Sequence, residues 1–200
     1  MTPQQEEKAR SGFIDDLKKQ KVETFAMRRL FDVIPFIFPD PKTCSEWKIS
    51  IAHLLRVDPC SVYLIGSGCT GISLNPNKGY KAFGDDSDID IAIISGYHFE
   101  MSWRSLRELG AEKYKLSPAA KASLNEHRDS NLYWGMIATD KILNLLPFGN
   151  EWIKAGIEIS KKPPMDGREI KFRLYRDSYS FVSYHLNNLR NLQSELLTRK

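Results

Sequence analysis

The segment at residues 84–96, GDDSDIDIAIISG, changes abruptly from acidic to apolar and constrains the fold more than any other part of the chain. Its second half alternates in the pattern of a strand with one buried face. On a strand, alternate side chains share a face and lie about 7 Å apart. Asp88 and Asp90 therefore point one way, while Ile89 and Ile91 point the other way, into a core.

Strand formation gives no reason to place two carboxylates on one face, since Asp is depleted in strands. At an effective dielectric near 20, two such charges repel by about 2 kcal/mol. A hard cation between Asp88 and Asp90 would turn this repulsion into binding, and Mg²⁺ commonly takes one or two carboxylates together with substrate phosphates. The alternative is structural, with Asp85, Asp86 and Asp88 as turn residues at a solvated strand start.

The remaining periodicities predict a mixed α and β chain around this strand. Helices are expected over residues 4–32 in two pieces, 44–57, 99–110, 117–129, 131–146, 150–159 and 178–200. Strands are expected over residues 60–68, 87–95 and 168–177. This order predicts an α+β fold with a small mixed sheet. The 200 residues suit one domain, with a helical lead-in at 1–58, a sheet-bearing core with a helical insertion at 59–177 and a terminal helix at 178–200.

A glycine-rich turn follows the first predicted strand. The apolar residues 62–65 precede Gly66, Ser67 and Gly68. Glycine permits a tight turn and close approach of a phosphate to the backbone, and successive N–H groups there form an anion-binding nest. The glycines, Gly71 included, lack the spacing of a dinucleotide fingerprint, and no Gly-Lys-Ser/Thr ending makes a P-loop. An ordinary turn is the alternative interpretation.

Together, the Gly-Ser turn and the Asp-x-Asp strand resemble the nucleotidyltransferase superfamily of DNA polymerase β. In that family the turn holds the triphosphate of a nucleotide, the two acids bind two divalent metal ions, and a third acid lies on a later strand. The resemblance implies that Gly66, Ser67 and Gly68 bind phosphates, and that Asp88 and Asp90 are catalytic ligands of Mg²⁺ or Mn²⁺. It also implies the nucleotidyltransferase fold, extended by a helical region that shapes the second substrate.

The resemblance covers residues 60–95 and leaves the third acid to be found. The predicted strand at 168–177 places Glu169, Lys171 and Arg173 on one polar face. We expect Glu169 to be the third catalytic metal ligand. Lys171 or Arg173 could instead bind the triphosphate, since a guanidinium fork suits phosphate.

Other charged residues are weaker candidates. Glu158 becomes a candidate ligand if the segment AGIEIS is a strand, whereas Asp177 is at least as well placed to cap the terminal helix. The loop at 69–86 is longer than the usual family gap, and its Lys78 and Lys81 are available to phosphates. A solvated surface loop is an equal alternative for these two lysines.

Composition limits the partners. The chain has 29 basic and 25 acidic residues, a net charge of +4 that suits a polyanionic ligand. Three cysteines without C-x-x-C spacing predict neither a disulfide framework nor a zinc site and favour the cytoplasm. The sequence contains no run of about 18 apolar residues, so no membrane-spanning helix is predicted.

We therefore expect a metal-dependent nucleotidyltransferase that moves NMP from an NTP to a hydroxyl of RNA, a protein or a small molecule. The resemblance is to small stand-alone prokaryotic members, some of which belong to toxin–antitoxin or phage-defence modules. The alternatives are a non-catalytic nucleotide-binding protein on the same fold and an oligonucleotide second-messenger synthase. The NTP, the acceptor and the oligomeric state are left open.

Overall fold

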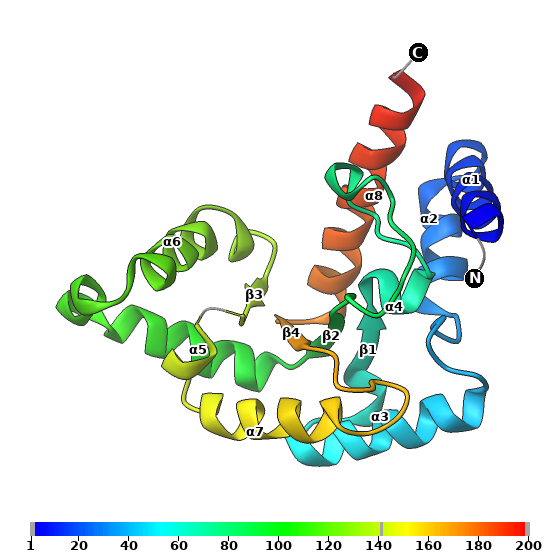
Figure 1. Ribbon diagram of the computed structural model, residues 1–200. Coiled ribbons are helices and arrows are strands. Elements are labelled where there is room, and N and C mark those ends of the chain that lie inside the picture. The colour runs from blue at the N-terminus through cyan, green and yellow to red at the C-terminus, as the bar shows by residue number, and fades with distance from the viewer. Residues whose placement is uncertain (1–2, 141, 199–200) are drawn as a thin grey trace.

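The acidic strand lies inside a four-stranded mixed sheet in the computed structural model, which describes residues 3–140 and 142–198 (Figure 1). In chain order the strands are β1 (Val62–Ile65), β2 (Ile89–Ile94), β3 (Met136–Ala138) and β4 (Ile170–Tyr175). β2 pairs antiparallel with β1 and parallel with β4, and β3 pairs antiparallel with β4. The spatial order is β1-β2-β4-β3, so the predicted α+β class and small mixed sheet are confirmed.

Because β2 lies between β1 and β4, the segments singled out in the sequence are neighbours. Ile65 at the end of β1 is opposite Asp90, and Asp90 is beside Lys171 of β4. The N–H of Ile89 donates to the carbonyl oxygen of Glu169 at 2.8 Å. The register therefore places the polar faces of β2 and β4 side by side.

Helices account for most of the remaining chain. The α-helices are α1 (Pro3–Lys19), α2 (Val22–Ala26), α3 (Pro41–Leu55), α4 (Gly66–Thr70), α5 (Gly96–Glu108), α6 (Pro118–Glu126), α7 (Gly149–Ser160) and α8 (Ser178–Thr198). The π-helical turns η1 (Met27–Phe31) and η5 (His127–Asn131) continue α2 and α6, and the 3₁₀ turns are η2 (Pro59–Ser61), η3 (Pro76–Lys78), η4 (Gly110–Lys115) and η6 (Leu143–Leu145). No helix in the described ranges is both long enough and apolar enough to cross a bilayer.

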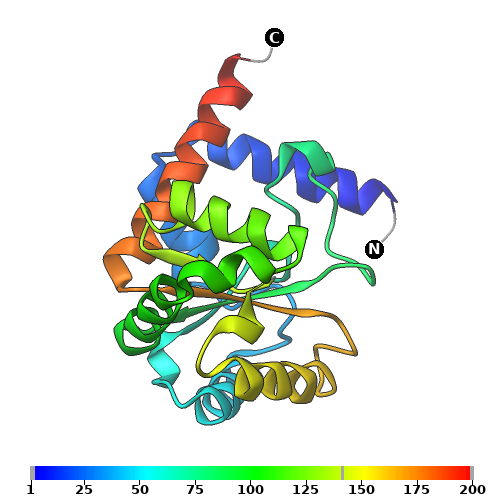
Figure 2. The ribbon, with the colours of Figure 1, turned by 90° about the vertical axis from the view of Figure 1, so that its left-hand side faces the viewer.

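The two faces of the sheet are covered differently. α3 and α7 lie side by side against one face, where the side chains of Ile89, Ile91 and Ile93 are fully buried (Figures 1 and 2). Trp152 of α7 packs on Phe172 of β4 with ring centroids 5.2 Å apart. α8 rises from the other face beside α1 and α2. The polar faces of β2 and β4 point toward this second side.

The predicted helix at 131–146 is wrong, because its middle forms β3. Gly135 has a positive φ of 63°, which turns the chain out of the preceding helical segment. Met136 and Ile137 are both buried, and the N–H of Arg176 donates to the carbonyl oxygen of Gly135 at 2.9 Å. Pairing with the edge of β4 thus overrides a local pattern that is typical of a helix.

The other predicted elements are confirmed with shifted ends. The predicted strand at 60–68 ends at Ile65, and its last three residues begin α4. The described residues do not include 1–2, 141 and 199–200. These belong, in that order, to the predicted lead-in, the predicted 131–146 helix and the predicted terminal helix.

Asp177 caps α8, which is one of the two roles that the sequence left open for it. Its Oδ1 accepts a hydrogen bond from the N–H of Ser180 at 2.7 Å, and this bond, with the neighbouring Arg176, lowers the pKa of Asp177 to about 2. We expect Asp177→Ala to reduce the free energy of unfolding by about 1 kcal/mol at pH 7.

The pH dependence of this loss follows from the lowered pKa. The folded pKa of Asp177 lies below its unfolded value, so the stabilisation is complete above about pH 4 and is lost as the pH falls toward 2. Urea unfolding of wild type and variant at pH 7 and pH 2.5 measures this. A difference of equal size at both pH values would contradict the capping role.

Candidate active site

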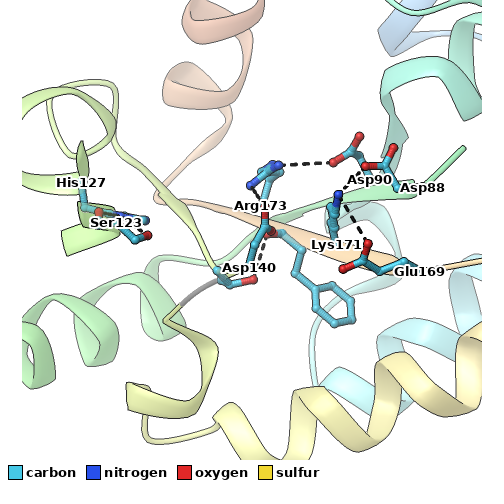
Figure 3. A network of polar contacts seen from close by, with 10 residues as sticks. Asp88, Asp90, Ser123, His127, Asp140, Glu169, Lys171 and Arg173 are labelled. Atoms are coloured by element: carbon cyan, nitrogen blue, oxygen red, sulfur yellow. Dashed lines mark hydrogen bonds and ion pairs between the residues drawn. The ribbon is translucent and has the colours of Figure 1, made fainter. Parts of the chain in front are cut away.

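Asp88 and Asp90 point from β2 to one side of the sheet, where each faces a basic side chain of β4 (Figure 3). Lys171 Nζ lies 2.5 Å from Asp88 Oδ2, and an Arg173 guanidinium nitrogen lies 3.5 Å from Asp90 Oδ1. All four side chains are between 23% and 27% exposed. The two ion pairs are therefore partly shielded from solvent and still open to a ligand.

Arg173 also binds a third acid, Asp140, which was not among the candidates predicted from the sequence. Its other terminal nitrogen donates to Asp140 Oδ2 at 2.9 Å (Figure 3). Asp140 follows β3, whose Ala138 is paired with Arg173. A helix was expected over this segment, and a helix gives no reason to place Asp140 beside Asp90. Only the pairing of β3 with β4 would have indicated that the two acids lie close together.

The two acids of β2 differ in how well their charge is balanced. Partial burial opposes ionisation of Asp88, but the hydrogen bond and charge of Lys171 outweigh it and hold the pKa of Asp88 below its usual value. Burial raises the pKa of Asp90 to about 6, even though the charge of Arg173 acts in the opposite direction. Burial thus disfavours the charged form of Asp90, and Arg173 compensates this charge only in part.

The Gly-Ser turn meets the acid pair at Gly66. Gly66 has a φ of 65°, and a Cβ added there would lie 2.8 Å from Asp90 Oδ2. The backbone conformation therefore favours glycine, and a side chain at this position would displace the Asp90 carboxylate. Ser67 follows in the first turn of α4, while Gly68 packs close to Leu64 and its carbonyl oxygen accepts from the N–H of Ile37 at 3.1 Å.

A pocket of about 500 Å³ opens beside this contact. The sheet and the turn after β1 contribute Gly66, Asp90 and Arg173 to its lining, and α8 contributes a further wall. The loop residues 74–76 line a third side, so part of the long segment between the two motifs does lie beside the site.

The two loop lysines for which phosphate contact and a solvated loop were equal alternatives differ in their surroundings. Lys81 forms an exposed ion pair with Asp86 at 3.0 Å and does not line the pocket. Lys78 belongs to η3, and its positive charge contributes to the lowered pKa of Asp88.

The candidates for a third metal ligand are scattered. Glu158 lies on α7, not on a strand, and its carboxylate pairs with Lys162 at 2.8 Å, so the strand on which its candidacy depended is absent. Glu169 precedes β4, is 73% exposed and lies 3.6 Å from Lys171 Nζ. Within residues 3–140 and 142–198, no three His, Cys, Asp or Glu side chains are grouped so that they could hold a metal ion.

The acid pair still has the chemistry of a magnesium site. Asp88 and Asp90 offer hard oxygen ligands on one face, and the charge of Asp90 is paired with only one guanidinium nitrogen of Arg173, at 3.5 Å. Two carboxylates completed by phosphate oxygens are a common set for Mg²⁺. The residues therefore fit one ion bound together with a phosphate ligand, and the role of Glu169 at a second ion stays a prediction.

Comparison with models of known protein families, with curated proteins and with solved structures found no match. The functional interpretation consequently depends on the geometry around Asp88 and Asp90 and on the motif resemblance.

Proposed function

We propose that this protein is a metal-dependent nucleotidyltransferase that transfers NMP from an NTP to a hydroxyl acceptor. The observation that carries the proposal is the contact between Gly66 and Asp90, because it joins a potential phosphate-binding turn and a carboxylate pair in one site. The pocket beside this contact is large enough for a nucleotide, since small-molecule sites typically measure about 300–1,000 Å³.

In this proposal each group of the site has a distinct role. The turn at Gly66 and Ser67 holds the phosphates through backbone N–H groups. Asp88 and Asp90 would hold Mg²⁺ or Mn²⁺, which supplies charge neutralisation of the phosphates and a lowered pKa of the attacking hydroxyl. Arg173 and Lys171 stabilise negative charge on the triphosphate, and the new bond to the α-phosphate forms as pyrophosphate leaves.

A non-catalytic nucleotide-binding protein is the second candidate, and one observation favours it. Lys171 and Arg173 already neutralise part of the charge of Asp88 and Asp90, so these side chains take the place of metal ions. A site of this kind would bind phosphates without consuming the nucleotide. An oligonucleotide second-messenger synthase would be a form of the first candidate, with a second nucleotide as the acceptor.

Pyrophosphate release separates the two candidates. The protein is incubated with each of the four NTPs, with Mg²⁺ or Mn²⁺, alone and with a cell extract that supplies acceptors. We expect pyrophosphate release above an EDTA control with at least one nucleotide. Nucleotide binding without release under every condition would contradict transfer and favour the binding protein.

A further inference from the structure

The pocket beside Asp90 has two chemically different walls. The sheet wall carries charge, on Asp90 and Arg173. The α8 wall carries four neutral hydrogen-bonding side chains, Tyr184, His185, Asn188 and Asn191, together with Leu189, Leu192 and Glu195. Such a pocket suits a ligand with a highly charged end and a neutral end rich in hydrogen-bonding groups.

Helical spacing explains why these side chains share one wall. Asn188 and Asn191 lie four and seven positions beyond Tyr184. Residues at this spacing share one face of an α-helix. His185, beside them, has its pKa lowered to about 4 by burial, and its Nε2 lies 3.3 Å from the Tyr175 hydroxyl. The imidazole is therefore neutral at physiological pH. Glu195, one turn beyond Asn191, adds a carboxylate at the far end of this wall.

The neutral wall has the groups that recognise a nucleobase. An asparagine amide offers one donor and one acceptor side by side, which complements the N6 and N7 positions of adenine, whereas guanine is most often read by Arg or Lys. No Arg or Lys of the described part of α8 lines this pocket. The ring of Tyr184 provides an aromatic surface at the same wall, and aromatic side chains stack on bases.

We propose that Asn188 and Asn191 bind the base of the nucleotide and that they select adenine. This inference rests on the proposed function, because it assumes that the phosphates lie at the sheet wall near Gly66. A ligand held in this way extends from the sheet to α8, with its charged and neutral ends at the matching walls.

The test compares ligands with and without a base. Binding of non-hydrolysable ATP and GTP analogues and of inorganic tripolyphosphate is measured by calorimetry with Mg²⁺. The double variant Asn188→Ala/Asn191→Ala is compared with wild type and with Asn187→Ala, a neighbouring asparagine of α8 that does not line the pocket. Asn188 and Asn191 are exposed, so the double variant should keep its fold, which a melting curve checks.

We expect wild type and Asn187→Ala to bind the ATP analogue about tenfold or more tightly than the GTP analogue. The double variant should lose this preference and bind tripolyphosphate as wild type does. Equal affinity of wild type for the two analogues, or a preference that survives in the double variant, would overturn the inference. If wild type binds tripolyphosphate but no nucleotide tightly, base recognition is wrong and the phosphate site stands. If it binds neither, the proposed function fails as well.

Discussion

Asp90→Asn is expected to lower transfer activity by roughly 10³-fold, and Asp88→Asn to do the same. An amide is a neutral and much weaker ligand for a hard cation than a carboxylate, while its size and shape are almost the same. Activity is measured as pyrophosphate release at saturating Mg²⁺, with folding checked by the melting curve. Asp86→Asn is the matched control, because Asp86 is exposed and paired with Lys81 outside the pocket.

Asp90→Asn should not destabilise the protein. The folded pKa of Asp90, about 6, lies above its unfolded value, so the stability of the wild type falls as the pH rises from about 4 to about 6 and stays lower above that range. Asparagine does not ionise, and Arg173 keeps Asp140 as a partner. Asp90→Asn should therefore leave the free energy of unfolding at pH 7.5 unchanged or raise it, by up to about 3 kcal/mol. A variant that keeps near-wild-type turnover, or one that unfolds, would contradict the metal-ligand role.

Gly66→Ala is expected to have the second largest effect, on stability and nucleotide binding together. At a φ of 65° an alanine costs about 1–2 kcal/mol of backbone strain. Its Cβ would also lie 2.8 Å from Asp90 Oδ2, so the carboxylate must move. We expect nucleotide affinity to fall by about tenfold or more, since the phosphate turn and the acid pair can no longer keep their contact.

Gly79→Ala is a control that separates the effect of backbone strain from the effect of displacing the Asp90 carboxylate. Gly79 has a similar φ of 60°, but no atom lies within 4 Å of an added Cβ. It should show the strain in urea unfolding and retain wild-type nucleotide affinity and activity. If Gly66→Ala and Gly79→Ala behave alike in nucleotide binding, the contact between Gly66 and Asp90 has no functional role.

The central strand and the orientation of its side chains could be predicted from the sequence, because a period of two assigns each residue to a face. Asp88 and Asp90 lie together, and Ile89 and Ile91 are buried on the other side, as the alternation indicated. The proximity of Gly66 to Asp90 was implied by the family resemblance, since no local pattern specifies which turn lies beside which strand.

What local patterns could not provide were the partners contributed by distant segments. Asp140 reaches Arg173 only because the short strand β3 pairs with the edge of β4, a contact between residues far apart in the chain. The periodicity of residues 178–200 predicted the terminal helix, but it did not predict that Tyr184, Asn188 and Asn191 line a pocket, because this depends on how α8 crosses the sheet. Glu158 was considered because a short apolar run fits a strand as well as a helix.

Calorimetry of the wild type with a non-hydrolysable nucleotide analogue, at pH 7.5 in Mg²⁺ and again in EDTA, tests whether Asp88 and Asp90 bind a metal ion. If Asp88 and Asp90 hold a metal ion together with the phosphates, Mg²⁺ should tighten binding by about tenfold or more in the wild type and have little effect in Asp90→Asn. Equal affinity of the wild type in Mg²⁺ and in EDTA would contradict the account, because Lys171 and Arg173 would then bind the phosphates without a metal ion.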